Sequence, residues 1–207
     1  MEDLLLVNSK FDRIFELARG KDVLDIGCLG GDRGIDISRT PYAMISSVAK
    51  SCLGIDLDGN EIERWRVKGY DVVRADAEDF HLGRKFDVIA ATDVIEHLAN
   101  PGLFLECVRE HLRPTGWLYI VTPNALSLNC ALKTLFGFNL MINPEHTCWY
   151  DRITLRQLLE RSGFQVVEEY WQDYQQHPVA ALMTSFRKNL AAHMILVAQI
   201  RHAGSTA

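Results

Sequence analysis

Residues 22–31 read DVLDIGCLGG, an apolar run that ends in glycines. A short apolar run bounded by glycine is typical of a buried strand, and glycine lets the backbone turn sharply where the strand ends. Such a turn at the carboxyl end of a first parallel strand also lets a ligand approach the backbone closely. The stretch therefore predicts an open α/β sheet with a ligand site at that edge.

Strand-like and helix-like patterns alternate along the chain. Apolar runs predict strands at residues 22–28, 52–58, 71–75, 86–92, 117–121, 164–171 and 193–200. Helical spacing or capping residues predict helices at residues 11–18, 41–50, 61–68, 101–112 and 154–161, and a turn is predicted at residues 113–116. This alternation indicates βαβ units and a parallel sheet, so the predicted fold class is α/β.

Composition places the chain among single-domain globular proteins. Of its 207 residues, 48% are hydrophobic and 24% charged, and 22 basic against 27 acidic residues give a net charge of −5. We therefore expect one domain over residues 1–207. An acidic chain lacks the positive field that supplies nucleic-acid affinity, so we expect no nucleic-acid partner.

Targeting signals and cysteine motifs are missing from the sequence. Two acids precede a short apolar run at the start, the reverse of a secretory signal, and no apolar stretch is long enough to span a bilayer. The five cysteines form no C-x-x-C pair, which argues against a disulfide framework or a zinc knuckle. These features predict a cytoplasmic protein without stable membrane insertion, and they leave its oligomeric state open.

Four aspartates follow four successive predicted strands. Asp25 lies near the end of the first, Asp56 near the end of the second, and Asp76 and Asp93 follow the third and fourth. Because the carboxyl ends of parallel strands meet at one edge, we expect these acids to lie together. A carboxylate after the second strand can accept both ribose hydroxyls, and a short acid after the third, beside Ala77, can accept an adenine amino group. One such acid could be only a helix cap, but four in register favour a ligand.

The glycine spacing separates two classes of nucleotide site. The dinucleotide fingerprint G-x-G-x-x-G would need glycines at 27, 29 and 32, but Leu29 and Asp32 occupy the last two positions. This mismatch argues against a nicotinamide or flavin oxidoreductase. The chain also lacks the lysine of a G-x-x-x-x-G-K-[ST] loop, so the site fits a positively charged nucleoside better than a polyphosphate.

In these motifs the chain resembles the class I S-adenosylmethionine-dependent methyltransferases over nearly its whole length. The motifs that carry the resemblance are VLDIGCLGG, GIDLD, ADAEDF, FDVIAATDVIEHL and LRPTGWLYIVTPN. Within the family it is similar to the small-molecule enzymes, typified by the ubiquinone-biosynthesis O-methyltransferases and by methyltransferases of sugars or polysaccharides. Where the family has G-x-G-x-G, this chain has Leu29 in place of the middle glycine.

The resemblance implies a fold, a cofactor and a set of contacts. The fold is a Rossmann-like, seven-stranded, mostly parallel sheet with helices on both faces and an antiparallel last strand. The cofactor is S-adenosyl-L-methionine, with the N-terminal helix closing over it. The implied contacts are Asp25, Gly27, Cys28 and Gly31 for the methionine end, Asp56 and Leu57 for the ribose, and Asp76, Ala77 and Asp93 for the adenine side.

Two histidines, His97 and His146, are the candidate catalytic residues. Methyl transfer from a sulfonium is an in-line displacement, and a base is needed only where the acceptor is a hydroxyl that loses its proton. His97 follows the fourth strand, where a packing role is the alternative. His146 precedes Trp149 and Tyr150, which could wall an acceptor pocket. A neutral histidine accepts a proton near neutral pH, so both residues fit a general base.

A D-x-x-E-H arrangement offers a second way to activate a hydroxyl. It consists of Asp93, Glu96 and His97. In the ubiquinone-type relatives a similar E-x-x-E-H cluster can hold a divalent cation, which would polarise an acceptor hydroxyl. Here the first acid is one methylene shorter, and we assign no metal ligand from the sequence.

Residues 124–150 are predicted to be a substrate lid inserted into the domain. Leu128, Leu132, Leu135 and Phe136 recur at helical spacing and would face either the core or an apolar acceptor. Docking on a membrane surface is the alternative, but the segment has Lys133 as its only basic residue besides histidine and lacks the basic face that interfacial binding usually requires.

The predicted function is S-adenosylmethionine-dependent methyl transfer to a small-molecule acceptor, at oxygen. The alternative is a non-catalytic protein of the same fold that binds the cofactor as a sensor or a partner subunit. Amino-nucleobase methyltransferases usually carry [ND]-P-P-[YF] after the fourth strand, whereas residues 92–95 read TDVI here, which argues against a DNA or RNA adenine as acceptor.

Overall fold

The computed structural model describes residues 5–7, 9–30, 36–137, 143–173, 182, 184 and 186–201. The strands are β1 (Leu5–Val7), β2 (Asp22–Ile26), β3 (Ser51–Asp56), β4 (Val72–Arg74), β5 (Phe86–Thr92), β6 (Leu112–Pro123), β7 (Phe164–Gln172) and β8 (His193–Ile200). The α-helices are α1 (Asp12–Ala18), α2 (Pro41–Val48), α3 (Gly59–Val67), α4 (Pro101–His111), α5 (Leu128–Leu135) and α6 (Arg152–Arg161). Short 3-10 helices are η1 (Ile37–Arg39), η2 (Ile95–His97) and η3 (Lys188–Leu190).

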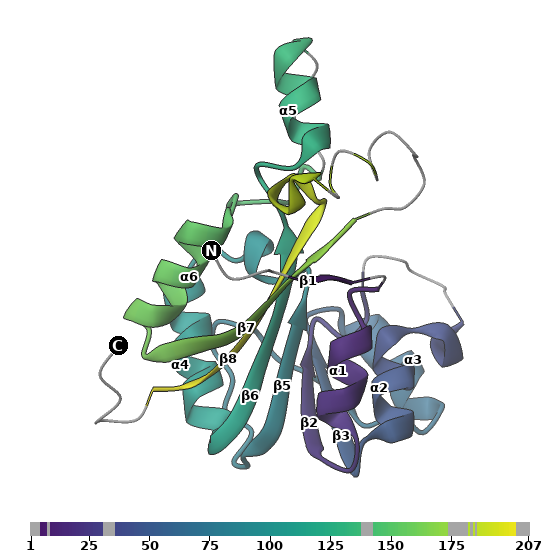
Figure 1. Ribbon diagram of the computed structural model, residues 1–207. Helices are drawn as coiled ribbons and strands as arrows, with labels where there is room; N and C mark the ends of the chain where they lie inside the picture. The colour runs from purple at the N-terminus through teal and green to yellow at the C-terminus, as the bar shows by residue number, and fades with distance from the viewer. Residues whose placement is uncertain are drawn as a thin grey trace.

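The strands form one twisted sheet with helices on both faces (Figure 1). The strand order is β1-β7-β8-β6-β5-β2-β3-β4. Only β8 runs antiparallel to its neighbours, β6 and β7. The predicted α/β sheet with an antiparallel last strand is confirmed. One strand was not predicted: β1 adds to the outer edge of β7 in parallel, so the seven expected strands become eight.

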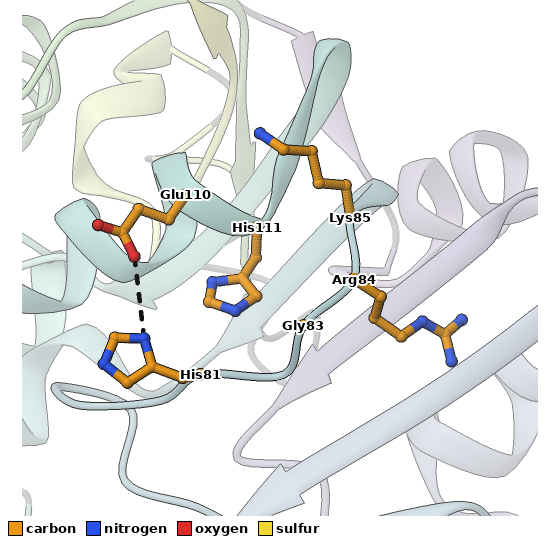
Figure 2. Close-up of a pocket in the computed structure, with 6 residues that line it drawn as sticks. All are labelled: His81, Gly83, Arg84, Lys85, Glu110 and His111. Carbon is orange, nitrogen blue, oxygen red and sulfur yellow. Dashed lines mark ion pairs between the residues drawn. The ribbon is translucent and has the colours of Figure 1, made fainter.

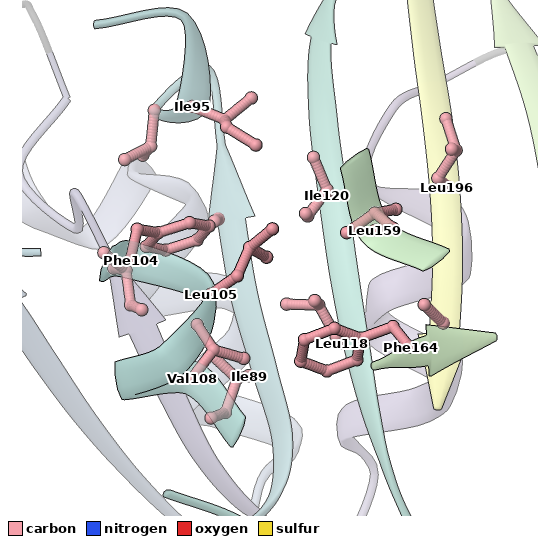
Figure 3. Close-up of a cluster of buried hydrophobic side chains, with 14 of the residues drawn as sticks. Ile89, Ile95, Phe104, Leu105, Val108, Leu118, Ile120, Leu159, Phe164 and Leu196 are labelled. Atoms are coloured by element: carbon pink, nitrogen blue, oxygen red, sulfur yellow. The ribbon is translucent and has the colours of Figure 1, made fainter. Parts of the chain in front are cut away.

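Alternate residues of each strand enter two separate cores. Leu24 and Ile89 face the side covered by α4 and α6, where Phe104, Leu159 and Phe164 fill the space (Figure 3). The opposite face belongs to α1, α2 and α3, and its buried residues include Val23, Val88, Ile14, Tyr42, Ile45 and Trp65. Strands buried on both faces read as continuous apolar runs, which is why the sequence located them.

The turn predicted at residues 113–116 is not found, because these residues belong to strand β6. Strand β6 begins at Leu112 and continues through these residues, and the register shifts opposite Phe86 and Val88. Gly116 lies so close to β5 that a Cβ there would stand 2.9 Å from the carbonyl oxygen of Asp87. The pattern that resembles a turn is therefore a strand irregularity packed closely against its neighbour.

The two ends of the 124–150 segment meet. Asn124 and Tyr150 form an isolated parallel bridge, and the amide of Ala125 donates to the carbonyl of Tyr150 at 2.9 Å. Between them, α5 stands out beyond the carboxyl ends of the strands (Figure 1). Four apolar residues of this segment were expected to face either the core or an apolar acceptor. Three of them, Leu132, Leu135 and Phe136, are exposed and so do not enter the core.

No helix in the part of the chain that the structure describes is long and apolar enough to cross a membrane.

Candidate functional site

The glycine turn after β2 is built from backbone contacts to β3. The amide of Gly27 donates to the carbonyl of Ile55 at 2.9 Å, and that of Gly30 donates to the carbonyl of Gly27 at 3.2 Å. Gly27 has a φ of +72°, and a Cβ on it would stand 2.6 Å from Cγ2 of Val94. Both the backbone conformation and the space therefore require glycine at this position.

Leu29, which replaces the family's middle glycine, is buried in the core under the turn. Gly30 supplies the left-handed conformation that follows it, with a φ of +63°. Cys28 is also buried, and its side chain packs against Gly54. Gly31, the remaining predicted contact here, lies outside the described residues.

Asp25 and Asp56 sit on neighbouring strands at this edge. Asp25 is buried, and burial, followed by the nearby charge of Asp56, raises its pKa to about 7. Asp56 accepts hydrogen bonds from the amides of Leu29 at 3.3 Å, Leu57 at 2.7 Å and Asp58 at 3.2 Å. These bonds fix the carboxylate between the two turns, and a carboxylate with about four acceptor positions retains capacity for a ligand hydroxyl.

The residues predicted for the adenine side lie at the same edge, since β3, β4 and β5 run parallel. Asp76 is exposed, and its Oδ1 accepts the amide of Glu78 at 2.9 Å. Leu57 is 59% exposed although it adjoins a buried strand, so its side chain is free to pack against a planar group. Ala77 is half-buried.

Asp93 has a different environment from the other three acids. Its φ is +55°, and it forms an ion pair with Lys10, from the segment that precedes α1. Nε2 of the buried His193 lies 3.8 Å from its other carboxylate oxygen. The hydroxyl of Tyr119 donates to the carbonyl of Lys10 at 2.6 Å and so holds this segment over the sheet. Sequence reasoning did not find Lys10, because nothing in its local pattern distinguishes it.

Glu96 is a buried carboxylate in η2. Its Oε2 accepts the hydroxyl of Thr122 at 2.8 Å, while its Oε1 is buried and accepts no hydrogen bond from the described residues. Burial is the first cause that raises its pKa, to about 7. Its carbonyl accepts the amides of Thr147 at 2.8 Å and Cys148 at 3.1 Å, which tie the end of the 124–150 segment to η2.

This tie brings the two candidate histidines together. The rings of His97 and His146 have centroids 4.7 Å apart and planes at 89°, and the ring of Trp149 lies 6.5 Å from that of His146. Burial and the neighbouring His97 lower the pKa of His146. One ligand atom each of Glu96, His97 and His146 lies within 4.8 Å of the others. The histidines thus belong to one cluster although 49 positions separate them in the sequence.

A cavity of about 400 Å³ lies elsewhere, where β5 begins and α4 ends (Figure 2). His111 at its wall accepts the amide of Leu82 at 2.9 Å through Nε2 and contacts the carbonyl of Cys107 at 2.8 Å through Nδ1, so both ring nitrogens serve the fold. His81 pairs with Glu110 across 3.9 Å at the exposed rim. None of the predicted site residues lines this cavity.

Comparison with known proteins identifies the family. A protein-family model described as a methyltransferase domain matches residues 4–169, which is most of the chain. The chain belongs to the class I S-adenosylmethionine-dependent methyltransferases. S-adenosylmethionine is the cofactor of this family, as the sequence predicted.

Two relatives illustrate the range of similarity. A probable S-adenosylmethionine-dependent methyltransferase of Mycolicibacterium smegmatis is 31% identical over 160 residues, covering 75% of this chain and 56% of the relative. The human mitochondrial ubiquinone biosynthesis O-methyltransferase is 28% identical over 163 residues, covering 71% and 42%. The chain thus spans about half the length of the curated relatives it matches.

Solved methyltransferases have the same fold at low sequence identity. An S-adenosylmethionine-dependent enzyme of Archaeoglobus fulgidus superposes with a TM-score of 0.67 at 20% identity, covering 92% of this chain and 91% of the other. Magnesium protoporphyrin IX methyltransferase of Synechocystis, solved with bound S-adenosylhomocysteine, gives 0.63 at 14% identity, covering 93% and 82%.

Proposed function

We propose that this chain transfers the methyl group of S-adenosylmethionine to a hydroxyl of a small-molecule acceptor in the cytoplasm. The oxygen forms its bond to the methyl carbon as the carbon–sulfur bond breaks, the sulfonium becomes a neutral thioether, and the hydroxyl proton is released. Family membership and the O-methyltransferase names among the relatives support the reaction class.

The observation that carries the proposal is the link between Asp56 and the glycine turn. Asp56 accepts the amide of Leu29 at 3.3 Å, so this hydrogen bond joins the carboxylate at the end of β3 to the turn after β2 in one surface. On this surface Asp56 would accept the ribose hydroxyls, while the turn at Gly27 and the buried Asp25 would receive the methionine end. Exposed Leu57 would pack against the nucleoside, with Asp76 and Ala77 beside the adenine.

His97 and His146 would activate the acceptor. His97 lies in η2, beyond the end of β5, and its ring faces His146, which belongs to the segment 124–150 that we propose to be the substrate lid. Exposed apolar side chains on that segment support a lid that closes on an acceptor with an apolar part; they are Leu126, Leu132, Leu135, Phe136 and Trp149. The histidines can either take the hydroxyl proton or hold a cation that polarises the hydroxyl.

The cofactor half of the proposal is tested by calorimetry with S-adenosylhomocysteine. Asp56→Asn keeps the size of the side chain but removes its charge, and we expect it to weaken binding at least about tenfold, a loss of 1.4 kcal/mol. Asp71→Asn is the matched control, since Asp71 is exposed at the opposite edge of the sheet. Equal affinity in wild type and Asp56→Asn would refute this cofactor site.

The acceptor half is tested by turnover of methyl-labelled cofactor with a panel of phenols, sugars and carboxylates. With an acceptor that turns over, we expect His146→Ala to lower kcat about 100-fold, within the range for loss of an acid–base group. An unchanged kcat would remove His146 from the mechanism. Binding of the cofactor without turnover of any acceptor would instead favour the sensor alternative.

A further inference from the structure

Asp93 lies beside the glycine turn. Strands β5 and β2 are neighbours, with Ala91 opposite Ile26, so Asp93 follows the end of β5 close to the turn that follows β2. The next residue, Val94, approaches this turn so closely that its Cγ2 would stand 2.6 Å from a Cβ on Gly27. Asp93 therefore borders the surface proposed for the methionine end of the cofactor.

The acceptor side begins just after Asp93. Helix η2 starts two residues later and carries His97, whose ring faces that of His146. Asp56, proposed to bind the ribose, is on the opposite side of the turn, because β3 and β5 flank β2. In the proposed reaction a methyl group passes from the turn to the histidines, so it leaves a sulfonium that lies near Asp93.

Two features set Asp93 apart from the other acids of this edge. Its φ of +55° is the only left-handed conformation of a non-glycine residue in the described part of the chain. Its Oδ1 is buried and accepts no hydrogen bond from the described residues. Strained backbone and buried oxygens without a donor concentrate at functional sites. Both features therefore favour a role for Asp93 in the reaction.

Lys10 supplies the positive charge that faces this carboxylate. It pairs with Oδ2 of Asp93, and the hydroxyl of Tyr119 fixes its backbone by donating to the Lys10 carbonyl at 2.6 Å. Nε2 of His193 lies 3.8 Å from Oδ1, but burial lowers the pKa of His193 to about 4 and keeps its ring neutral near pH 7. Within the described residues, Lys10 is thus the one cation that pairs with Asp93.

We propose that Lys10 neutralises Asp93 and so limits the preference of the site for positively charged S-adenosylmethionine over its neutral product, S-adenosylhomocysteine. This inference rests on the proposed cofactor site. During transfer the electron pair of the carbon–sulfur bond stays on sulfur, which loses its charge. A carboxylate without a partner would stabilise the charged reactant more than the transition state and would raise the barrier. Lys10 acts through Asp93 and is a positioning residue.

The test is calorimetry of the full chain with each ligand at low ionic strength, and its readout is the ratio of the two dissociation constants. Lys10→Met should shift this ratio about tenfold towards S-adenosylmethionine, the order expected of one unit charge several ångströms from sulfur. Asp93→Asn leaves Lys10 without its partner and should shift the ratio about tenfold the other way. Asparagine also tolerates the left-handed backbone. The double variant should restore the wild-type ratio.

Two control variants separate charge from other effects. Lys10→Arg keeps the charge and should keep the ratio. Lys21→Met removes an exposed lysine at the opposite edge of the sheet, just before β2, and should also leave the ratio unchanged. Thermal unfolding checks the fold of each variant, and Asp93→Asn decides the test by itself if Lys10→Met does not fold.

Three results would overturn the proposal: an unchanged ratio in folded Lys10→Met or Asp93→Asn, shifts of the same sign in both, or an equal shift in Lys21→Met. Asp56→Asn distinguishes this failure from failure of the proposed cofactor site. Loss of a ribose contact weakens both ligands alike and leaves their ratio unchanged. Equal affinities in wild type and Asp56→Asn therefore count against the cofactor site, whereas an unmoved ratio in Lys10→Met counts against the role of Lys10.

Discussion

Lys10 forms an ion pair with Asp93, a residue 83 positions later in the chain, and so ties the segment before α1 to the end of β5. Both side chains are largely buried, with 21% and 33% of their surface exposed. Removal of either charge therefore leaves the other partly desolvated and unpaired.

A double-mutant cycle of Lys10→Met and Asp93→Asn measures this pair. We expect a coupling of about 1 kcal/mol in the free energy of unfolding, determined by urea denaturation. Arg66 and Glu63 provide the control, because they form a pair at 3.6 Å with 61% and 68% of their side chains exposed. Their coupling should be near zero. A Lys10–Asp93 coupling no larger than the control would show that the contact contributes nothing to stability.

Gly27→Ala is expected to destabilise the glycine turn for two separate reasons. The new Cβ would meet Val94 at 2.6 Å, and the backbone would hold a left-handed conformation that costs alanine about 1–2 kcal/mol. Gly30→Ala incurs only the second cost, since nothing lies within 4 Å of its Cβ position. Denaturation should therefore rank Gly27→Ala below Gly30→Ala in stability. The reverse order would mean that the close approach to Val94 is relieved by movement of the turn.

Asp25 makes the stability of the cofactor-free protein depend on pH. Its folded-state pKa of about 7 lies above the ordinary 3.8, so between these values the folded protein binds more protons than the unfolded chain. The free energy of unfolding consequently falls as pH rises from about 4 to 7. Asp25→Asn imitates the protonated form, so its melting temperature should match wild type at pH 4 and exceed it at pH 8. A difference that stays constant with pH would contradict the assignment.

Glu169 joins α6 to β7 through two arginines. Its side chain is 5% exposed and is bound by Arg152 and Arg156, with 2.8 Å between Nε of Arg156 and Oε1. Glu169→Gln removes the buried charge that both arginines share, and we expect a loss of about 3 kcal/mol in the free energy of unfolding. Glu160→Gln, which breaks the more exposed i,i+4 pair with Arg156, should cost about 0.5 kcal/mol or less. Similar losses in both variants would refute the importance of burial here.

Much of the fold could be predicted because its strands are buried on both faces. The runs at β5 and β8 were located at their observed bounds, 86–92 and 193–200, since continuous apolar residues leave few alternatives. Strand β1 was missed because three residues at a sheet edge carry almost no pattern. Helical spacing identified α5 but does not indicate what packs against the helix. A core position was one expectation for Leu135 and Phe136, and both are exposed.

The candidate site also has a part that could be predicted from the sequence and a part that could not. Parallel strands necessarily bring residues after their ends to one edge, and Asp25 and Asp56 followed from that rule alone. The partners of Asp93 and Glu96 depend on contacts between distant segments. Lys10 and Thr147 have no local signal that points to a carboxylate or a carbonyl in another part of the fold.

The bridge between Asn124 and Tyr150 allows the length of the intervening stretch to vary independently of the sheet. Because the chain leaves β6 and returns before α6 at adjacent points, a longer or shorter insert can be accommodated without displacement of the sheet. The insert nevertheless delivers His146 to η2 through the backbone of Glu96. Under the proposed function, changes elsewhere in this stretch would alter acceptor preference while the proposed cofactor-binding edge and the histidine pair are retained.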